Sequence, residues 1–165
     1  MPKVFAILLV LSLFLIGCSD NNEKKPVADK KYQILTNAEQ QIYQEFQQSL
    51  DINKLKDVEP ISIAKFYFQA GIDKKHDVEY ALYTDREDYI RWSKEEDEKI
   101  PDEHRGTKDY LLDLSKNLAK GKFVPTTDLT GYIEFVSTDD TKTKHGFQLI
   151  KNESGIWQVA FMPLQ

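Results

Sequence analysis

Residues 146–161, which read GFQLIKNESGIWQVAF, decide the fold class of this chain. On both sides of the stretch 152–155, large apolar residues alternate with polar or small ones, the pattern of β-strands whose side chains point to opposite faces in turn. The stretch itself is short and polar, and Gly155 can adopt the positive φ that a tight turn requires. The sequence therefore predicts an antiparallel hairpin over these residues.

The same alternation extends toward the N-terminus. Residues 132–135 predict a further strand, joined to the hairpin by 138–143, and 123–127 predict a fourth strand at an edge, where Pro125 is tolerated. We therefore expect a curved antiparallel sheet of three to four strands. Its core face is predicted to carry Ile133, Phe135, Phe147, Leu149, Trp157, Val159 and Phe161.

Before Gly121 the apolar residues recur with the period of an α-helix. The stretch 36–39 fits a capping box that opens a helix over about 37–50, and Pro60 can open a second helix that runs to Gly71. Further helices are expected after Asp77, after a second capping box at 84–87, and from Thr107 to a C-terminal cap at Gly121. Helices followed by an antiparallel meander predict an α+β fold, with the N-terminal helices packed on one sheet face.

The first residues predict export. Lys3 precedes an apolar run of thirteen residues, 4–16, interrupted only by Ser12; it is shorter than the roughly 20 residues that a spanning helix needs. A positive start, a short apolar run and small residues after it are typical of a secretory signal peptide.

The run ends in Leu15-Ile16-Gly17-Cys18, which resembles the lipobox of bacterial lipoproteins. The resemblance implies that residues 1–17 are cleaved and that a diacylglyceryl group on Cys18 anchors the protein to the outer side of the cell membrane; two acyl chains suffice for stable attachment. The alternative is an incidental cysteine after an uncleaved segment. Because Cys18 is the only cysteine, the chain can form no internal disulfide and no cysteine metal site.

The remaining chain divides into a tether and one domain. Residues 19–31 hold no large apolar residue except Val27, so we expect 18–33 to be a lipidated, disordered tether and 34–165 a single α+β domain. Loss of residues 1–17 removes Lys3 and makes the chain more acidic than its formal net charge of −5. An acidic chain is poorly suited to nucleic acid, whose phosphates require clustered Lys and Arg.

Residues 63–82 (IAKFYFQAGIDKKHDVEYAL) and the hairpin 146–161 resemble nuclear-transport-factor-2-like domains, which have a cystatin-like fold. The resemblance implies a sheet curled around the helices and often a conical pocket, in which the enzymes of that superfamily use buried Asp, Tyr or His. Residues 87–105 form a charged segment that is longer than the resemblance implies, and it is expected to be a solvated insertion.

Three residues are candidates for such a pocket: Tyr67, Tyr110 and His145. Each also has an ordinary structural interpretation, because a core tyrosine commonly keeps its hydroxyl in water and His145 stands at the start of a strand. No metal-binding spacing, glycine-rich phosphate loop or nucleophile motif occurs in the sequence. We therefore assign no catalytic residue, metal or cofactor.

The second sheet face offers a candidate interface, because it combines apolar and uncharged polar residues, as interfaces do. Its main residues are Tyr132, Glu134, Gln148, Ile150, Gln158 and Met162. We expect a homodimer or an envelope protein partner there; the alternative is a partly solvated sheet face, which is common in antiparallel sheets.

Three functions remain open from the sequence. The favoured hypothesis is a non-enzymatic binding module, held by lipid on the extracytoplasmic side of the cell membrane. The second is a small enzyme of the isomerase or dehydratase type, which needs an inward carboxylate or histidine beside a tyrosine. The third is a toxin-immunity or inhibitor lipoprotein, with which the small size and acidity agree.

Overall fold

The computed structural model describes residues 30–136 and 143–165. The predicted signal peptide, Cys18, most of the predicted tether and nearly all of the connection 138–143 lie outside these residues. The described chain begins with a short 3₁₀ turn, η1 (Lys30–Tyr32), and the Tyr32 ring already packs against the core. The described residues thus begin a few positions before the predicted domain boundary at residue 34.

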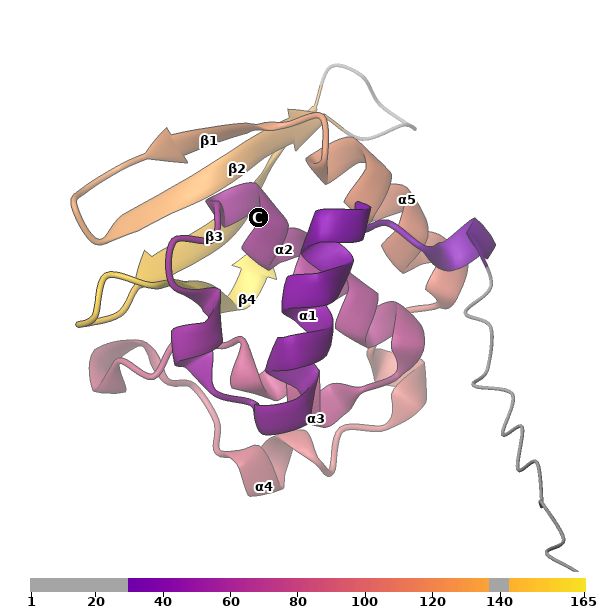
Figure 1. The fold of residues 1–165 in the computed structure, drawn as a ribbon, viewed down its shortest axis with the longest axis horizontal. Helices are drawn as coiled ribbons and strands as arrows, with labels where there is room; N and C mark the ends of the chain where they lie inside the picture. Colours follow the sequence, from indigo (N-terminus) through magenta and orange to yellow (C-terminus); the bar gives the residue numbers. More distant parts are fainter. Residues whose placement is uncertain (1–29, 137–142) are drawn as a thin grey trace, which may run out of the picture.

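The fold is α+β, which confirms the predicted class (Figure 1). Helical elements come first along the chain and the strands last. The helical elements after η1 are α1 (Asn37–Ser49), η2 (Ile52–Leu55), α2 (Pro60–Asp73), α3 (His76–Ala81), η3 (Glu87–Tyr89), α4 (Lys94–Asp97), η4 (Asp102–His104) and α5 (Lys108–Leu118). The strands are β1 (Lys122–Pro125), β2 (Thr130–Val136), β3 (Lys144–Lys151) and β4 (Trp157–Leu164).

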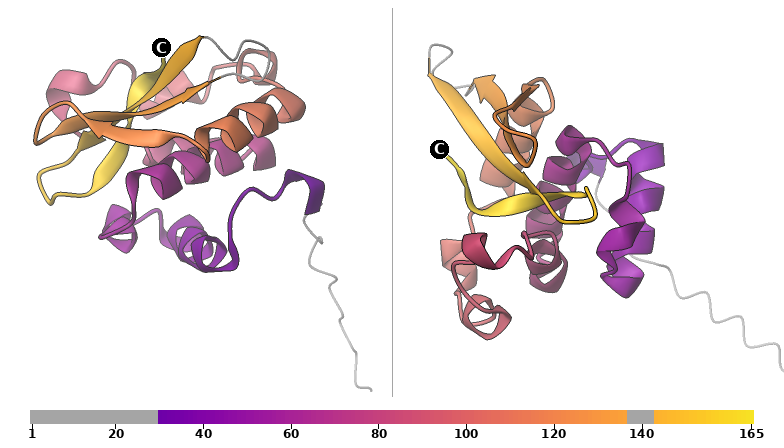
Figure 2. Two further views of the ribbon diagram at one scale, coloured as in Figure 1. Left: turned by 90° about the horizontal axis from the view of Figure 1, so that it is seen from above. Right: turned by 90° about the vertical axis from the view of Figure 1, so that its left-hand side faces the viewer.

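Helix α2 forms the middle of the domain, between the sheet and α1 (Figure 2). Its side chains are buried almost all round, which explains why its sequence is apolar on more than one face. Helix α1 covers α2 from outside, so it needs only one apolar stripe. It begins at the predicted capping box, in which Glu39 N–H donates to Thr36 Oγ1 and Thr36 N–H donates to the Glu39 carboxylate. Helix α5 lies beside α2.

The sheet is an antiparallel meander in the order β1-β2-β3-β4, with β1 at an edge as predicted. Ile133 pairs with Phe147, and Leu149 pairs with Val159. All four side chains are buried on the sheet face that the helices cover. The turn between β3 and β4 has Gly155 at φ 80°, which confirms the predicted hairpin.

A bulge in β4 corrects the predicted core face. Between the pairs Leu149–Val159 and Phe147–Leu164, β4 contains more residues than β3, and Met162 takes φ 52°. The strict alternation therefore fails after Val159. Phe161 is buried, but it packs against Tyr83 rather than with the main core, at 4.5 Å between ring centroids.

Two predicted helix signals act differently. Thr84 begins no α-helix; its Oγ1 accepts a hydrogen bond from Arg86 N–H, and only the single turn η3 follows. Helix α5 ends at Leu118, and its C-cap residue Ala119 has ordinary right-handed geometry, so Gly121 is not a left-handed cap. A Cβ at Gly121 would lie 2.6 Å from the backbone oxygen of Glu134, so glycine is required there for close approach to β2.

Candidate functional site

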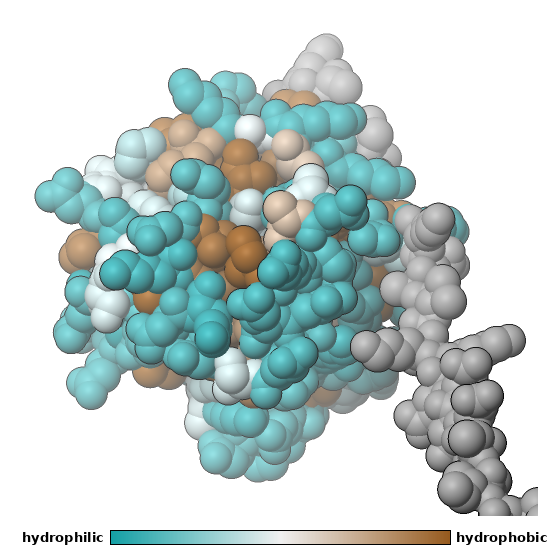
Figure 3. Space-filling view, in the orientation of Figure 1, coloured by the Kyte–Doolittle hydropathy of each residue, from teal (hydrophilic) through white to brown (hydrophobic). Residues whose placement is uncertain are grey.

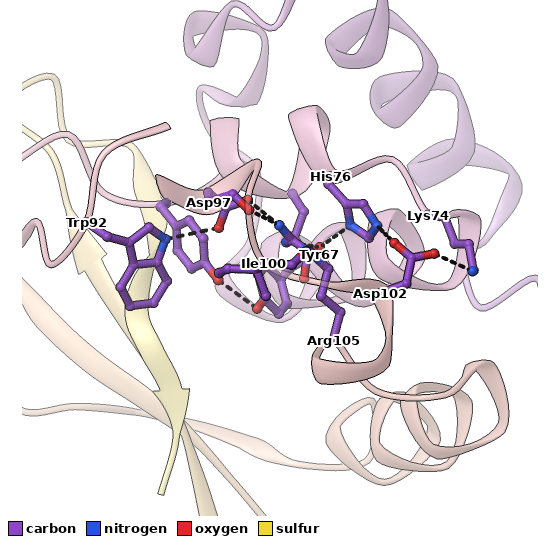
Figure 4. A network of polar contacts seen from close by, with 10 residues as sticks. Tyr67, Lys74, His76, Trp92, Asp97, Ile100, Asp102 and Arg105 are labelled. Atoms are coloured by element: carbon purple, nitrogen blue, oxygen red, sulfur yellow. Dashed lines mark hydrogen bonds and ion pairs between the residues drawn. The ribbon is translucent and has the colours of Figure 1, made fainter. Parts of the chain in front are cut away.

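A buried polar network joins α2 and α3 to residues 90–105, here called the strap (Figure 4). At its centre is Glu79 on α3, only 7% exposed. One carboxylate oxygen of Glu79 lies 3.2 Å from His76 Nδ1 and 3.7 Å from an Arg105 guanidinium nitrogen. His76 and Glu79 are neighbours because residues three apart on a helix share a face. Arg105 reaches them from the end of the strap.

His76 lies between two carboxylates. Its Nδ1 faces Glu79, and its Nε2 lies 3.5 Å from Oδ1 of Asp102, whose other oxygen accepts a hydrogen bond of 2.6 Å from Lys74 Nζ. The buried Nε2 makes no hydrogen bond to any described residue, so the ring is held by Glu79 on its own helix and lies close to Asp102 of η4.

The strap is also closed upon itself by a buried pair. Asp97, 3% exposed, accepts a 2.9 Å hydrogen bond from Arg105 Nη2 through one carboxylate oxygen. The other oxygen accepts a 3.0 Å hydrogen bond from the indole N–H of Trp92. The Arg105 guanidinium donates further to the backbone oxygens of Asp97 and Ile100. These charged and polar groups of the strap are therefore partnered inside the protein.

An aromatic cluster adjoins this network. The hydroxyls of Tyr67 and Tyr83 lie 2.9 Å apart, and the Tyr83 ring stacks on Phe161. Trp92 meets Phe161 edge to face, with ring centroids 4.7 Å apart. The Tyr80 hydroxyl donates to the backbone oxygen of Trp92 at 3.2 Å. The strap is consequently held by rings at one end and by charges at the other.

The environment changes the protonation of several groups. Burial raises the pKa of Glu79, and the neighbouring His76 and Arg105 oppose that rise only in part. Burial also raises the pKa of the Tyr67 and Tyr83 hydroxyls, which therefore stay neutral and able to donate. The hydrogen bond from Lys74 lowers the pKa of the exposed Asp102. A carboxyl with a raised pKa beside a neutral tyrosine could transfer a proton, if a substrate could reach it.

Access to Glu79 is restricted. A hollow of about 220 Å³ adjoins the network and is lined by its outer members His76, Asp102 and Arg105, together with Lys108 at the start of α5. Glu79 itself is buried behind them. The geometry therefore suits a clasp that fastens the strap better than it suits an open catalytic centre.

The three pocket residues predicted from the sequence are not brought together. Tyr67 belongs to the network, through its hydroxyl. Tyr110 is 54% exposed at the start of α5, and His145 is half-buried with its ring 5.6 Å from that of Phe135. Between α2 and the sheet, Phe68 and Phe147 are almost completely buried, with ring centroids 5.4 Å apart, so aromatic side chains fill the space where a conical pocket was expected.

The predicted interface face is partly covered. Gln158 is 2% exposed; its amide donates to the Tyr83 backbone oxygen at 3.2 Å and accepts from Asp85 N–H at 3.3 Å. Residues 83–86 run beside β4, where Thr84 N–H donates to Val159 O at 2.8 Å. Ile150 is buried as well. The prediction that Gln158 and Ile150 belong to an open interface is therefore wrong, because the chain itself buries them.

The other residues of that face stay accessible. Tyr132, Glu134 and Gln148 are half-buried, and Met162 is 63% exposed at the bulge. The exposed Lys144 pairs with Glu134 at 3.0 Å across β2 and β3. This reduced surface is what the structure offers for pairing through the sheet.

Sequence reasoning missed most of the network. It placed the three histidines in separate segments and took residues 87–105 as a solvated run. The spacing of His76 and Glu79 on one helix was one available signal, and a tryptophan among charged residues, Trp92, was another. Neither signal identifies Arg105 or Asp102 as the partner, because those contacts span 26 or more residues.

A second hollow lies at the far end of the domain. It measures about 520 Å³ and lies between η3, with the residues before it, and the β3–β4 turn; its lining includes Asp85, Glu87, Asp88, Arg86 and Glu153. In Figure 1 these segments lie at one end of the longest axis, whereas the described chain begins at the other end, at Lys30. On the face that carries α1, hydrophilic residues dominate, with hydrophobic ones between them near the centre (Figure 3).

Comparison with known protein families, curated proteins and solved structures finds no match to this chain. Within residues 30–136 and 143–165, no three His, Cys, Asp or Glu side chains are grouped so that they could hold a metal ion. No helix in this described part is long and apolar enough to cross a membrane.

Proposed function

We propose that the protein is an exported lipoprotein, anchored through diacylglyceryl-Cys18 to the extracytoplasmic side of the cell membrane, whose domain is a binding module. The leader supports the anchor: a short apolar run ends at the only cysteine of the chain. One observation supports the binding function most directly. The start of the described domain at Lys30 and the 520 Å³ hollow lie at opposite ends of the longest axis. A partner at the hollow would thus meet the end remote from the anchor.

The charge of the hollow defines the class of partner. Four carboxylates line it, and the single guanidinium there, that of Arg86, donates its Nε–H to the Lys151 backbone oxygen at 3.0 Å. Like charges confined in one hollow favour a partner of opposite charge and suppress acidic ones. We therefore expect an envelope protein or peptide that presents Lys or Arg side chains. The chain from Cys18 to Lys30 could span at most roughly 40 Å, enough to hold the domain clear of lipid headgroups.

The anchor is tested by mass spectrometry of protein extracted from native membranes. The expected product begins at Cys18 and carries a diacylglyceryl group, whereas a Cys18→Ser chain keeps residues 1–17. A native protein with Met1 still attached, or with a free thiol at Cys18, contradicts the lipoprotein proposal.

The binding surface is tested by charge reversal combined with crosslinking in intact cells. We expect Asp88→Lys with Glu153→Lys to abolish capture of a basic partner that the unmodified protein retains. The matched control is Glu45→Lys, an exposed acid on α1 away from the hollow. Equal capture by both variants contradicts the proposal; sedimentation of a dimer that depends on Tyr132 and Gln148 would instead favour pairing through the sheet face.

One observation keeps the enzyme hypothesis as a second candidate. Glu79 is an inward carboxyl with a raised pKa, and it adjoins both Tyr67 and His76, the combination that proton transfer in an isomerase or dehydratase requires. That role needs a substrate path to Glu79. Titration with small carbonyl compounds, followed by NMR, tests this path: perturbed Glu79 and Tyr67 resonances would favour the enzyme hypothesis, and an unchanged spectrum would remove it.

No contact among the described residues favours the toxin-immunity hypothesis specifically. A basic toxin partner would be captured in the same crosslinking experiment.

A further inference from the structure

A third hollow adjoins the one on which the proposed function rests. It measures about 340 Å³ and lies between the end of α1, α3 and β4. Its walls are mainly rings and aliphatic side chains, those of Leu50, Ile52, Tyr80, Ala81, Tyr83, Ile90 and Phe161. We call it the apolar hollow and the 520 Å³ hollow the acidic hollow. The two share Asp85 in their linings, so the segment 85–90 borders both.

The polar groups at the apolar hollow are already bonded inside the protein. The Tyr80 hydroxyl donates to the Trp92 backbone oxygen, and the Tyr83 hydroxyl lies 2.9 Å from a second tyrosine hydroxyl. The side-chain amide of Gln158 accepts from Asp85 N–H and donates to the Tyr83 backbone oxygen. An occupant therefore meets mainly carbon. An apolar side chain can enter without leaving a buried polar group unpaired, which would oppose its binding.

The segment between the hollows carries two apolar side chains in water. Tyr89 is 38% exposed and lines the acidic hollow, whereas Ile90 is 42% exposed and lines the apolar hollow. Single exposed apolar residues are ordinary on a protein surface. Two in succession, each at the border of one of two adjoining hollows, instead make a continuous surface. A partner segment lying across residues 89–90 would remove both side chains from water.

The charges at the junction determine what the occupant must carry beside its apolar side chain. Asp85 is exposed there, and its carboxylate forms no ion pair within residues 30–136 and 143–165. A Lys or Arg side chain at this point is attracted by Asp85 and by the carboxylates of the acidic hollow beyond it. Because the linings share only Asp85, one occupant that fills both hollows must extend across the segment 85–90, as a peptide chain does.

We propose that the apolar hollow is the second half of the binding surface and receives an apolar side chain of the same partner. This inference rests on the proposed binding function and narrows the class of partner. The partner presents an extended segment in which a Lys or Arg lies near a side chain such as that of Leu. The charges attract and orient the segment, while the apolar side chain, packed against Tyr83 and Phe161, supplies most of the affinity.

The experiment uses the full-length lipidated protein in phosphatidylcholine nanodiscs, with its isoleucine methyl groups labelled for NMR. Ile52 and Ile90 report on the apolar hollow, and the buried Ile133 serves as the internal reference. The probes are short glycine–serine peptides that carry one Arg and one Leu at a series of spacings, and empty nanodiscs give the blank. Matched peptides have Ala in place of Arg or of Leu.

At the best spacing, we expect the Ile52 and Ile90 methyl signals to shift while that of Ile133 stays in place. Replacing Leu by Ala should lower the affinity roughly tenfold, since burial of most of a Leu side chain is lost. Replacing Arg by Ala should lower it roughly threefold, because the charges it meets are exposed to water. These comparisons use the unmodified protein and so depend on no variant that could fail to fold.

Two variants separate the halves of the surface, with binding read at Ile52. Ile90→Asn should remove the gain from Leu and keep the gain from Arg. Val136→Asn changes a similarly exposed apolar residue at the end of β2 and, as the matched control, should leave both gains intact. Asp88→Lys with Glu153→Lys should remove the gain from Arg and keep the gain from Leu.

Three results would overturn the inference: Leu adds nothing at any spacing, the gain from Leu survives in Ile90→Asn, or no peptide shifts Ile52 at about 5 mM. If Leu adds nothing but the gain from Arg is lost in Asp88→Lys with Glu153→Lys, the acidic hollow and the proposed function still stand. If the gain from Arg survives in that double variant, the charge is recognised elsewhere. That outcome contradicts the proposed function and the joint surface with it.

Discussion

The contact of α2 with the sheet and the fastening of the strap are two different ways to hold a segment in one small domain. Helix α2 is held by apolar contact: Phe66, Phe68, Phe147 and Ile133 are fully or almost fully buried around it. The strap is held by the Trp92 ring and by a few charged pairs. Apolar contact scales with buried area, whereas an ionic contact depends on the geometry and partners of a few individual groups. The two regions should therefore respond differently to single substitutions.

The largest effect is expected in the core. Phe147→Ala should lower the free energy of unfolding by about 3–5 kcal/mol, because it removes a buried ring and leaves a cavity between α2 and β3. Denaturant titration measures it, and protection of α2 and of the strap should fall together. A loss confined to the strap would contradict the assignment of Phe147 to the common core.

The next effect separates the two regions. Arg105→Met should cost about 1–3 kcal/mol, since it leaves Glu79 and Asp97 without their cation, although opening of the strap lets water reach them. Hydrogen exchange should show lost protection in residues 92–105 and little change in α2. Equal loss in both regions would mean that the strap and the core open as one unit.

A smaller effect is expected at the start of α1. Thr36→Ala removes the capping hydrogen bond to Glu39 N–H and should cost about 1 kcal/mol. Thr36 lies outside the strap, so hydrogen-exchange protection of residues 92–105 should be unchanged. Thr36→Ser retains the hydroxyl and serves as the matched control; a similar loss of stability in both variants would rule out the cap as its cause.

The smallest effect concerns the sign of a pH dependence. Since the pKa of Glu79 is raised on folding, the folded state binds more protons than the unfolded state between the usual carboxyl pKa and the raised one. Glu79 therefore contributes stability that declines as the pH rises through that interval, by less than about 1.4 kcal/mol for each step of one in pH. Unfolding free energies at several pH values should decline less steeply in Glu79→Gln; an identical slope would contradict the raised pKa.

Much of the fold could be predicted from local patterns. The capping box at Thr36, the opening of α2 at Pro60 and the turn at Gly155 each depend on residues within four positions of one another. The inner sheet face was right for Ile133, Phe147 and Leu149, because strand alternation fixes which residues share a face. It failed for Phe161, since a bulge changes the count of residues without any warning in the apolar pattern.

The candidate site was much less predictable. Gln158 was expected on an open face. Residues 83–86, more than 70 positions earlier, instead lie alongside β4, and their backbone groups hydrogen-bond with the side-chain amide of Gln158. Charged side chains look alike in a sequence that contains 22 Lys and Arg and 27 Asp and Glu. Nothing local distinguishes Asp97, which is buried, from the neighbouring acids, which are in water.

The sequence by itself determined where most of the helices and the strands form, the α+β class and the acidic character of the chain, because each of these depends on near neighbours or on composition. Tertiary structure alone decided which side of the sheet the chain covers, that Glu79 is buried with His76 and Arg105, and that the charged segment is fastened to α3. The physical reason is the range of the interactions. A hydrophobic period or a helix cap depends on a few neighbouring residues, whereas the partner of a charged side chain is selected by packing among many similar residues far along the chain.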